Sequence, residues 1–253
     1  ILGEVSGAAV LGSIPRSALL SRGGITVAQD PMGATAEDFR RVRSALTYAN
    51  VDSQLHTLLI TSASPSEGKS TVAANLAFTL ADLRHTVLLI DADLRRPRVH
   101  EVAGIDGSVG LTSVLLNESE FKDARYSVPG SSLDILPSGG IAPNPAEILT
   151  SEAMSQLIAA ASEQYDFVVI DSPPILIVAD ASLLAPLVDG VIVVVDGMKT
   201  RRAALSKAIR ELEAAGARIL GAVLNRARPD QHRGGYYVTD SERKRGRLKR
   251  TRW

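Results

Sequence analysis

Residues 63–71 have the composition of a loop that binds phosphate groups, and they lie between an apolar run at 58–61 and a helical pattern. Backbone N–H groups of such a loop, and of the first turn of the helix that follows, point at phosphate oxygens. Gly68 lets the backbone approach a ligand closely, Lys69 adds a positive charge, and the Ser70 hydroxyl can bind Mg²⁺. The segment therefore predicts that the chain binds a nucleoside triphosphate together with magnesium.

One position of this loop departs from the usual G-x-x-x-x-G-K-[ST] pattern, because Ala63 stands in place of the first glycine. A serine-rich turn that only caps a helix is the alternative interpretation. If the loop binds phosphate, the expected contacts to the nucleotide come from Ser64, Pro65, Ser66, Glu67, Gly68, Lys69, Ser70 and Thr71.

Acidic residues follow two further apolar runs, at 86–90 and 166–170. The first run leads into Asp91 and Asp93, and the second leads into Asp171. Continuous β-branched runs are typical of strands buried on both faces, and the carboxyl ends of parallel strands form the edge where ligands bind. Any one of these acids alone could be a helix cap or a turn residue. Three converging elements favour a site in which Asp171 holds Mg²⁺, directly or through water.

The composition is that of a globular protein, with 253 residues, 45% of them hydrophobic, and no cysteine. Disulfides, thiolate metal sites and a cysteine nucleophile are therefore excluded. The sequence has no apolar run of about 18 residues, so we expect this chain to be soluble. It begins at Ile1 instead of Met, which leads us to expect a fragment or a processed chain with room for a membrane span upstream.

The formal net charge is zero, but basic residues are concentrated at the end of the chain. Residues 226–253 hold ten Lys and Arg against three Asp and Glu, a net charge of +7, and residues 1–225 carry −7. This tail lacks an apolar stripe, so we expect it to be disordered. A basic tail can be simply a solvated end, can bind anionic lipid headgroups, or can dock on the acidic body of a neighbouring copy.

Strand patterns alternate with helical patterns along the chain. This order predicts an α/β fold of the P-loop NTPase type, a doubly wound and mostly parallel sheet with helices on both faces. We expect an extended lead-in at 1–34, one nucleotide-binding domain at 35–227, and the basic tail at 228–253. Strands are expected at 58–61, 86–90, 133–136, 166–170, 190–195 and 219–224. Helices are expected at 36–50, directly after the phosphate loop, and at 152–164, 179–187 and 201–215.

Several of these segments together resemble the cytoplasmic domain of the bacterial tyrosine kinases that control capsule and exopolysaccharide synthesis. The resemblance covers residues 37 to about 226, and the set of motifs is far more specific than any one of them. The motifs are 63–71, 89–97, 136–139 with 143–149, 169–174 and the pattern Glu37-x-x-Arg40-x-x-Arg43. The segment 10–15 is also similar to the segment that follows the last membrane span in fused members of the family.

This resemblance implies a tyrosine kinase domain at 35–227 that uses ATP and Mg²⁺ to phosphorylate tyrosines of a neighbouring subunit. Lys69 would hold the phosphates, and Ser70 with Asp171 would hold the metal. The family pattern makes Asp91 the base that takes the tyrosine proton and Asp93 a metal ligand. The sequence is equally compatible with the exchange of these two roles.

Residues near the end of the chain have further implied roles. Asn225 matches the family position that hydrogen-bonds adenine, and Arg226 would flank the ring. The acceptors would be Tyr236 and Tyr237, where the family usually has a cluster of several tyrosines. With only two tail acceptors, this chain has less scope for multi-site phosphorylation. Tyr165 precedes a buried strand and is expected to be structural.

The family pairs its subunits in a ring through the residues that match Glu37, Arg40 and Arg43, so the resemblance implies a homo-oligomer. The alternative for these residues is a solvated stripe of ion pairs on a helix. Further implied partners are a membrane-spanning activator, in the same polypeptide or on a separate chain, and an opposing tyrosine phosphatase. The implied location is the cytoplasmic face of the membrane, and no specific nucleic acid is expected.

Two other functions are compatible with the phosphate loop. Chromosome-partitioning and division-site ATPases bind DNA or membrane, but they carry a signature lysine where this chain has Ser64, and they typically lack the Arg95-Arg96-Pro97 extension. A nucleotide-binding regulatory subunit with little catalysis is the third possibility. Arg98 and the two arginines before Pro97 either contact phosphate or a neighbour's tail, or lie in a solvent-facing turn.

Overall fold

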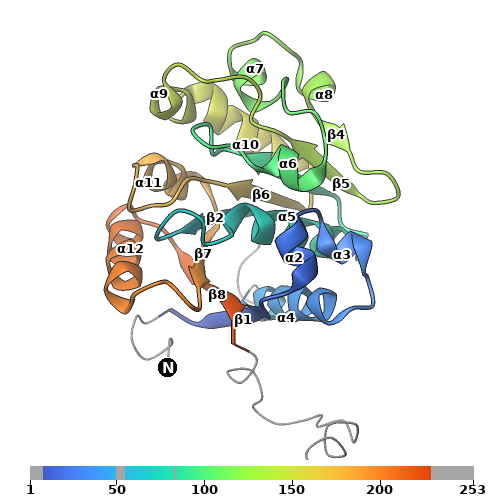
Figure 1. Ribbon diagram of the computed structural model, residues 1–253. Coiled ribbons are helices and arrows are strands. Elements are labelled where there is room, and N and C mark those ends of the chain that lie inside the picture. Colours follow the sequence, from blue (N-terminus) through green and yellow to red (C-terminus); the bar gives the residue numbers. More distant parts are fainter. Residues whose placement is uncertain (1–7, 50–54, 83, 229–253) are drawn as a thin grey trace, which may run out of the picture.

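The computed structural model describes residues 8–49, 55–82 and 84–228, and its centre is one eight-stranded sheet (Figure 1). In spatial order, the strands are β1 (Val10–Pro15), β8 (Ile219–Ala227), β7 (Gly190–Asp196), β2 (Thr57–Ser62), β6 (Phe167–Asp171), β3 (Val87–Asp91), β5 (Leu133–Leu136) and β4 (Tyr126–Ser127). Neighbouring strands are parallel, except that β4 runs antiparallel to β5.

Both faces of this sheet are apolar, and helices cover both. The strands β2, β3 and β7 are buried along their whole length, so successive residues alternate between two hydrophobic cores. One core is covered by α2 (Ala18–Arg22), α3 (Thr26–Gln29), α4 (Ala34–Ala49), α5 (Lys69–Ala81) and α6 (Val99–Ala103). The other is covered by α7 (Leu111–Leu115), α8 (Phe121–Ala124), α9 (Pro145–Leu149), α10 (Glu152–Gln164), α11 (Asp180–Leu184), the 3-10 turn η1 (Ala185–Leu187) and α12 (Arg202–Ala214). The predicted doubly wound α/β architecture is confirmed.

Most predicted strands and helices lie where the sequence placed them. The helix α10 and the strand β5 have the predicted bounds. The helix predicted at 179–187 is instead the short α11 followed by η1, because Pro186 has no N–H for an α-helical hydrogen bond. The segment between β3 and β5, for which the sequence indicated no element, contains α6, α7, α8 and β4.

The amino-terminal segment differs from the expected extended lead-in. Its described residues include β1, which lies beside β8 with Ile14 opposite Asn225, although the two strands come from opposite ends of the chain (Figure 1). A Cβ at Gly12 would lie 2.5 Å from Cγ2 of Val42, so this glycine is where α4 packs directly on the strand. Gly12, which lies in the segment expected to be an extended lead-in, is therefore a packing position in the core.

The predicted basic tail lies outside the described residues, together with its candidate acceptors Tyr236 and Tyr237. Its disorder and its partners therefore stay predictions from the sequence. In the part of the chain that the structure describes, no helix is both long enough and apolar enough to cross a membrane.

Candidate active site

A cavity of about 670 Å³ lies beyond the carboxyl ends of β2, β3 and β6. The phosphate loop forms one side of it, and the segment after β3 contributes Asp93 and three arginines. Another wall follows β6 and consists of Pro173, Pro174, Ile177 and Val178, and Leu20 and Gly23 also line the cavity. This is the sheet edge at which the sequence predicted the ligand.

The phosphate loop is a tight turn between β2 and α5. Gly68 has a φ of 92°, and a Cβ at this position would lie 2.2 Å from Nδ2 of Asn225. Ser66 also has a positive φ, 64°, which is uncommon for a residue with a side chain. The helix α5 begins at Lys69, so its unpaired N–H groups and the positive end of its dipole lie beside the cavity. This geometry suits an anionic ligand.

Glu67 supports the loop from behind instead of pointing into the large cavity. Its Oε2 accepts a hydrogen bond from the Ser64 N–H at 3.0 Å, and its Oε1 accepts one from the Thr200 hydroxyl. Burial raises the pKa of this carboxyl. The Glu67 side chain, a predicted nucleotide contact, is thus committed to the loop itself.

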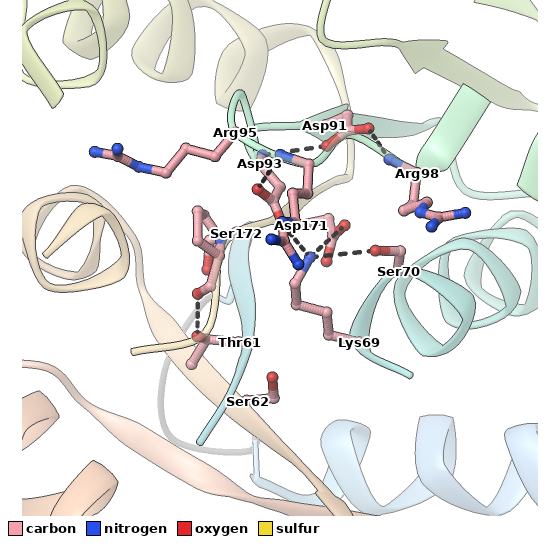
Figure 2. Close-up of polar contacts among 12 residues, drawn as sticks. Thr61, Ser62, Lys69, Ser70, Asp91, Asp93, Arg95, Arg98, Asp171 and Ser172 are labelled. Carbon is pink, nitrogen blue, oxygen red and sulfur yellow. Dashed lines mark hydrogen bonds and ion pairs between the residues drawn. The ribbon is translucent and has the colours of Figure 1, made fainter. Parts of the chain in front are cut away.

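Lys69 is the centre of a buried charge cluster. Its Nζ lies 2.7 Å from Oδ2 of Asp93 and 3.4 Å from Oδ2 of Asp171. The Ser70 hydroxyl oxygen lies 3.3 Å from the same nitrogen (Figure 2). Burial would lower the pKa of Lys69, but the charges of Asp171 and Asp93 outweigh burial and raise it. The structure therefore brings together four predicted site residues from three elements, each positioned by a strand or helix end.

Asp171 has the surroundings of a cation ligand. It is fully buried, burial raises its pKa, and its Oδ1 has no hydrogen-bond partner among the described residues. A buried carboxylate oxygen without a partner beside the Ser70 hydroxyl offers hard oxygen ligands. The described residues contain no group of three or more His, Cys, Asp and Glu placed to hold a metal ion. Mg²⁺ in phosphoryl-transfer sites needs only one or two protein carboxylates, since phosphates and water supply the rest.

Asp91 lies one layer behind this cluster. Its Oδ2 accepts hydrogen bonds from the backbone N–H groups of Arg98 at 3.1 Å and Val99 at 2.9 Å, and its Oδ1 accepts one from Asp93 N at 3.2 Å. Burial, and then the charge of Asp171, raise the pKa of Asp91 to about 7. Asp93 lines the cavity, so it is the carboxylate of the two with direct access to a ligand.

Asn225 and Arg226 hold the phosphate loop in place. The Asn225 side-chain amide donates to the Glu67 carbonyl oxygen at 2.8 Å. Arg226 Nη1 donates to the Ser66 carbonyl oxygen at 2.7 Å and to Asp196 Oδ2 at 2.7 Å. The amide of Asn225, which the resemblance assigned to adenine, is thus occupied by the loop, whereas Arg226 also lines the cavity.

Two residues of this clamp were missed by sequence reasoning. Asp196 is the last residue of β7 and Thr200 follows the strand, and each reaches the phosphate loop or its clamp. Asp196 ends a continuously apolar strand, which is the same signal that identified Asp91 and Asp171, so it could have been found. Thr200 carries no such signal.

The arginines after Asp93 do not form one solvent-facing group. Arg95 donates through Nε and Nη2 to both carboxylate oxygens of Asp180, at 2.8 and 3.0 Å. Arg98 pairs with Glu101 on the other side of the segment. Both arginines and Arg96 are exposed to solvent and also line the cavity, so contact with a bound phosphate or a neighbour's tail stays a prediction.

The predicted oligomer residues on α4 do not share one exposed face. Glu37 and Arg40 form a surface ion pair at 3.2 Å. Arg43 is largely buried and donates to the Thr79 carbonyl oxygen at 2.5 Å, near the carboxyl end of α5. Burial lowers the pKa of Arg43. The structure thus separates Arg43 from the other two residues and places it against the helix that starts at the phosphate loop.

Comparison with known proteins agrees with the fold. The sequence profile of the family described as AAA domain matches residues 61–218, which together with the phosphate loop and the sheet defines a P-loop nucleotide-binding protein. Tyrosine-protein kinase YwqD of Bacillus subtilis is 44% identical over 211 residues, which cover 83% of this chain and 89% of that protein. The kinase domain of Escherichia coli tyrosine kinase ETK superposes with a TM-score of 0.85 and 29% identity, over 94% of this chain and 97% of that one. The chain therefore belongs to the bacterial tyrosine-protein kinases.

The division-site ATPases share the fold less closely. The cell division ATPase MinD of Pyrococcus furiosus gives a TM-score of 0.58 with 28% identity, over 69% of this chain and 76% of that one. The prediction of a tyrosine kinase is thus confirmed, and the ATPase alternative gains no support.

Proposed function

We propose that this kinase transfers the γ-phosphate of ATP, bound with Mg²⁺, to tail tyrosines of a neighbouring copy, and thereby regulates the synthesis and export of a capsule or exopolysaccharide. The observation that carries the proposal is the position of Lys69 between Asp93 and Asp171, beside a preformed phosphate loop. Phosphoryl transfer depends mainly on positioning and on neutralisation of the phosphate oxygens, and this arrangement supplies both.

The residues around the cavity divide the work of binding. Lys69 and the loop N–H groups of residues 66–70 hold the β- and γ-phosphates, and Arg226 flanks the adenine from the rim. Ser70 and Asp171 hold Mg²⁺, with Asp93 in support. When bound, the metal would neutralise negative charge on the phosphate oxygens.

Transfer forms one bond and breaks one. The tyrosyl oxygen attacks the γ-phosphorus, and the bond from that phosphorus to the bridging oxygen breaks, so ADP leaves. A phenol with a pKa of about 10 attacks slowly unless a carboxylate accepts its proton. We assign the role of accepting this proton to the pair of Asp91 and Asp93. Asp93 lies at the cavity wall, and Asp91 stands behind it with a pKa raised to about 7.

Tyr48 and Tyr165 make poorer acceptors than the tail. The Tyr165 hydroxyl donates to Asp134 at 2.7 Å, and its ring is buried, so this residue is structural. Tyr48 is 79% exposed, but it lies on the regular helix α4. Tyr236 and Tyr237 follow two glycines and are the acceptors in this proposal.

Transfer between copies requires an assembly. We assign the exposed pair of Glu37 and Arg40 to contact with a second copy, with Arg43 bracing α4 from inside. A membrane-spanning activator, an opposing tyrosine phosphatase and a place at the cytoplasmic face of the membrane complete the proposal. These partners rest on the family resemblance.

The test is intact-mass and phosphopeptide analysis after incubation with Mg²⁺ and ATP. We expect phosphate on Tyr236 or Tyr237, a loss of at least about 10²-fold in rate for Lys69→Met, and no tail phosphate in Tyr236→Phe/Tyr237→Phe. ATP hydrolysis without any phosphotyrosine would contradict the proposal, provided that a membrane activator segment also fails to restore transfer.

A further inference from the structure

One wall of the cavity combines an exposed apolar side chain with a fixed positive charge. The wall is the segment from β6 to α11, in which Pro173, Pro174, Ile177 and Val178 line the cavity. Ile177 is 60% exposed, so a large apolar side chain is open to solvent at the wall of this cavity. Its N–H donates to the Pro174 carbonyl oxygen at 3.1 Å, so a closed turn holds the side chain at the surface.

Arg95 provides the positive charge and is held rigidly. Its partner Asp180 is fully buried in the first turn of α11, and both carboxylate oxygens are used by this one guanidinium. A bidentate pair fixes the plane of the guanidinium as well as its position. The two bonds engage Nε and Nη2, which leaves Nη1 for another acceptor. Asp180 is therefore a positioning residue for Arg95.

This wall is next to the catalytic acids but away from the phosphate side. The strands β3 and β6 are neighbours, with Asp91 opposite Asp171, and Ala92 N–H donates to the Asp171 carbonyl oxygen at 2.8 Å. Figure 2 shows the Arg95 side chain extending away from Lys69, on the opposite side from Arg98. An acceptor hydroxyl must reach the carboxylates from a direction that the nucleotide does not occupy, and this wall offers one.

The tail of the chain has matching chemistry. Tyr236 and Tyr237 follow two glycines, and Asp240 comes three residues after the second tyrosine. A tyrosine ring packs well on proline and isoleucine, and a carboxylate a few residues away suits a fixed guanidinium. The net charge of the whole tail is positive, so a general attraction to Arg95 is not the reason for binding.

We propose that Ile177 and Arg95, the latter oriented by Asp180, form the subsite that receives the acceptor tyrosine and an acidic residue on its carboxyl side. The ring packs on Ile177 and the adjoining prolines, and Arg95 Nη1 binds the carboxylate of Asp240 from a second copy. This inference rests on the proposed transfer to tail tyrosines and specifies which residues select them.

The test uses the full chain with Tyr236→Phe/Tyr237→Phe as the parent enzyme and a synthetic peptide of residues 230–243 as the acceptor. We expect Ile177→Ser and Arg95→Lys each to raise the KM for the peptide about tenfold, with the KM for ATP changed less than twofold. Asp240→Asn in the peptide should raise its KM on the parent enzyme but not on Arg95→Lys. Glu101→Gln, which breaks the other arginine pair at the rim, is the matched control and should leave the peptide KM unchanged.

A variant that leaves the buried Asp180 carboxylate without its partner can misfold. A double variant in which both residues are neutral therefore separates misfolding from loss of the subsite. Arg95→Gln/Asp180→Asn buries no unpaired charge and should retain its melting temperature and its KM for ATP, yet show the raised KM for the peptide. An unchanged peptide KM in this double variant and in Ile177→Ser would overturn the subsite. If the parent enzyme transfers no phosphate to the peptide while it hydrolyses ATP, the proposed transfer itself fails, and the subsite fails with it.

Discussion

At the amino edge of the sheet, Oδ2 of Asp189 accepts three hydrogen bonds, from His56 N–H, Thr57 N–H and the Thr57 hydroxyl, at 2.7 to 2.9 Å. At the carboxyl edge of the same sheet, Asp171 is fully buried and its Oδ1 has no partner among the described residues. Burial would raise the pKa of Asp189, but these hydrogen bonds outweigh it and lower that pKa, whereas burial raises the pKa of Asp171.

The same contrast holds for a second pair of aspartates. Asp166, at the amino edge, has its pKa lowered first by the backbone N–H of Thr86, while Asp91, at the carboxyl edge, has its pKa raised to about 7 by burial. Hydrogen bonds at the amino edge thus stabilise the ionised acids and the fold. At the carboxyl edge, burial outweighs the partners of Asp91 and Asp171 and disfavours their ionised forms, which is the usual exchange of stability for function at an active site.

The largest effect should come from removing the charge of Asp171. Asp171→Asn keeps the shape of the side chain but offers magnesium and Lys69 a neutral amide, so we expect transfer to tyrosine to fall by about 10²- to 10³-fold. A radioactive or mass-based assay of tail phosphorylation measures this loss. Activity within about threefold of wild type would show that the metal is held elsewhere.

Asp189→Ala should have a smaller effect of a different kind. The substitution leaves the N–H groups of His56 and Thr57 without their acceptor, and we expect the free energy of unfolding to fall by about 1–3 kcal/mol. Chemical denaturation measures this change, and the KM for ATP serves as the control because it should not move. Loss of ATP binding at unchanged stability would remove the distinction between the two edges.

The two edges should also respond differently to pH. The pKa of Asp91 is about 7 in the folded protein and about 4 in the unfolded chain. Between these two pH values, Asp91 therefore carries a proton only in the folded state. Its ionisation therefore lowers the free energy of unfolding as the pH rises from about 4 to about 7. Asp189 behaves in the opposite way, since its lowered pKa stabilises the fold above about pH 4 and that contribution is lost in acid.

We therefore expect the melting temperature of the nucleotide-free protein to fall between about pH 5 and pH 7. In Asp171→Asn the fall should be shallower, because the charge of Asp171 contributes to the raised pKa of Asp91. Thermal scans in matched buffers measure both slopes. A melting temperature that rises over this range in both proteins would contradict the assignment.

The smallest effect should come from Thr86→Val at the amino edge. The Thr86 hydroxyl donates to Asp166 Oδ2 at 3.0 Å and accepts from Asp166 N–H at 3.1 Å, but the site is exposed to water. Exposed hydrogen bonds contribute little, so we expect a loss of about 0.5 kcal/mol in the free energy of unfolding with full kinase activity. A decrease in the free energy of unfolding as large as that of Asp189→Ala would contradict the expectation that exposed hydrogen bonds contribute little.

Local patterns predicted the carboxyl edge well. The phosphate loop and the acids of β3 and β6 were found because each is a few residues at the end of an apolar strand. What the sequence could not indicate are contacts between distant segments, such as Asn225 with Glu67, or Arg95 with Asp180. These contacts depend on how the sheet brings strand ends together.

The same limit explains the other differences. Gly12 resembled a linker residue because its packing against Val42 depends on where α4 lies. Arg43 lies three residues after Arg40, a spacing that predicts a shared exposed face of the helix, yet its side chain turns inward to α5. A pattern along one helix shows which residues are neighbours, but another element decides which of them are covered.

The most direct test of the contrast between the edges is the melting temperature of Asp171→Asn beside that of the nucleotide-free wild type at neutral pH. Burial raises the pKa of Asp171 in spite of the nearby Lys69, so removal of this buried charge should stabilise the protein by about 1 kcal/mol, a rise of a few degrees, in the same variant that loses kinase activity. A melting temperature below that of wild type would show that Asp171 stabilises the fold, and the carboxyl edge would then not be the place where stability is exchanged for chemistry.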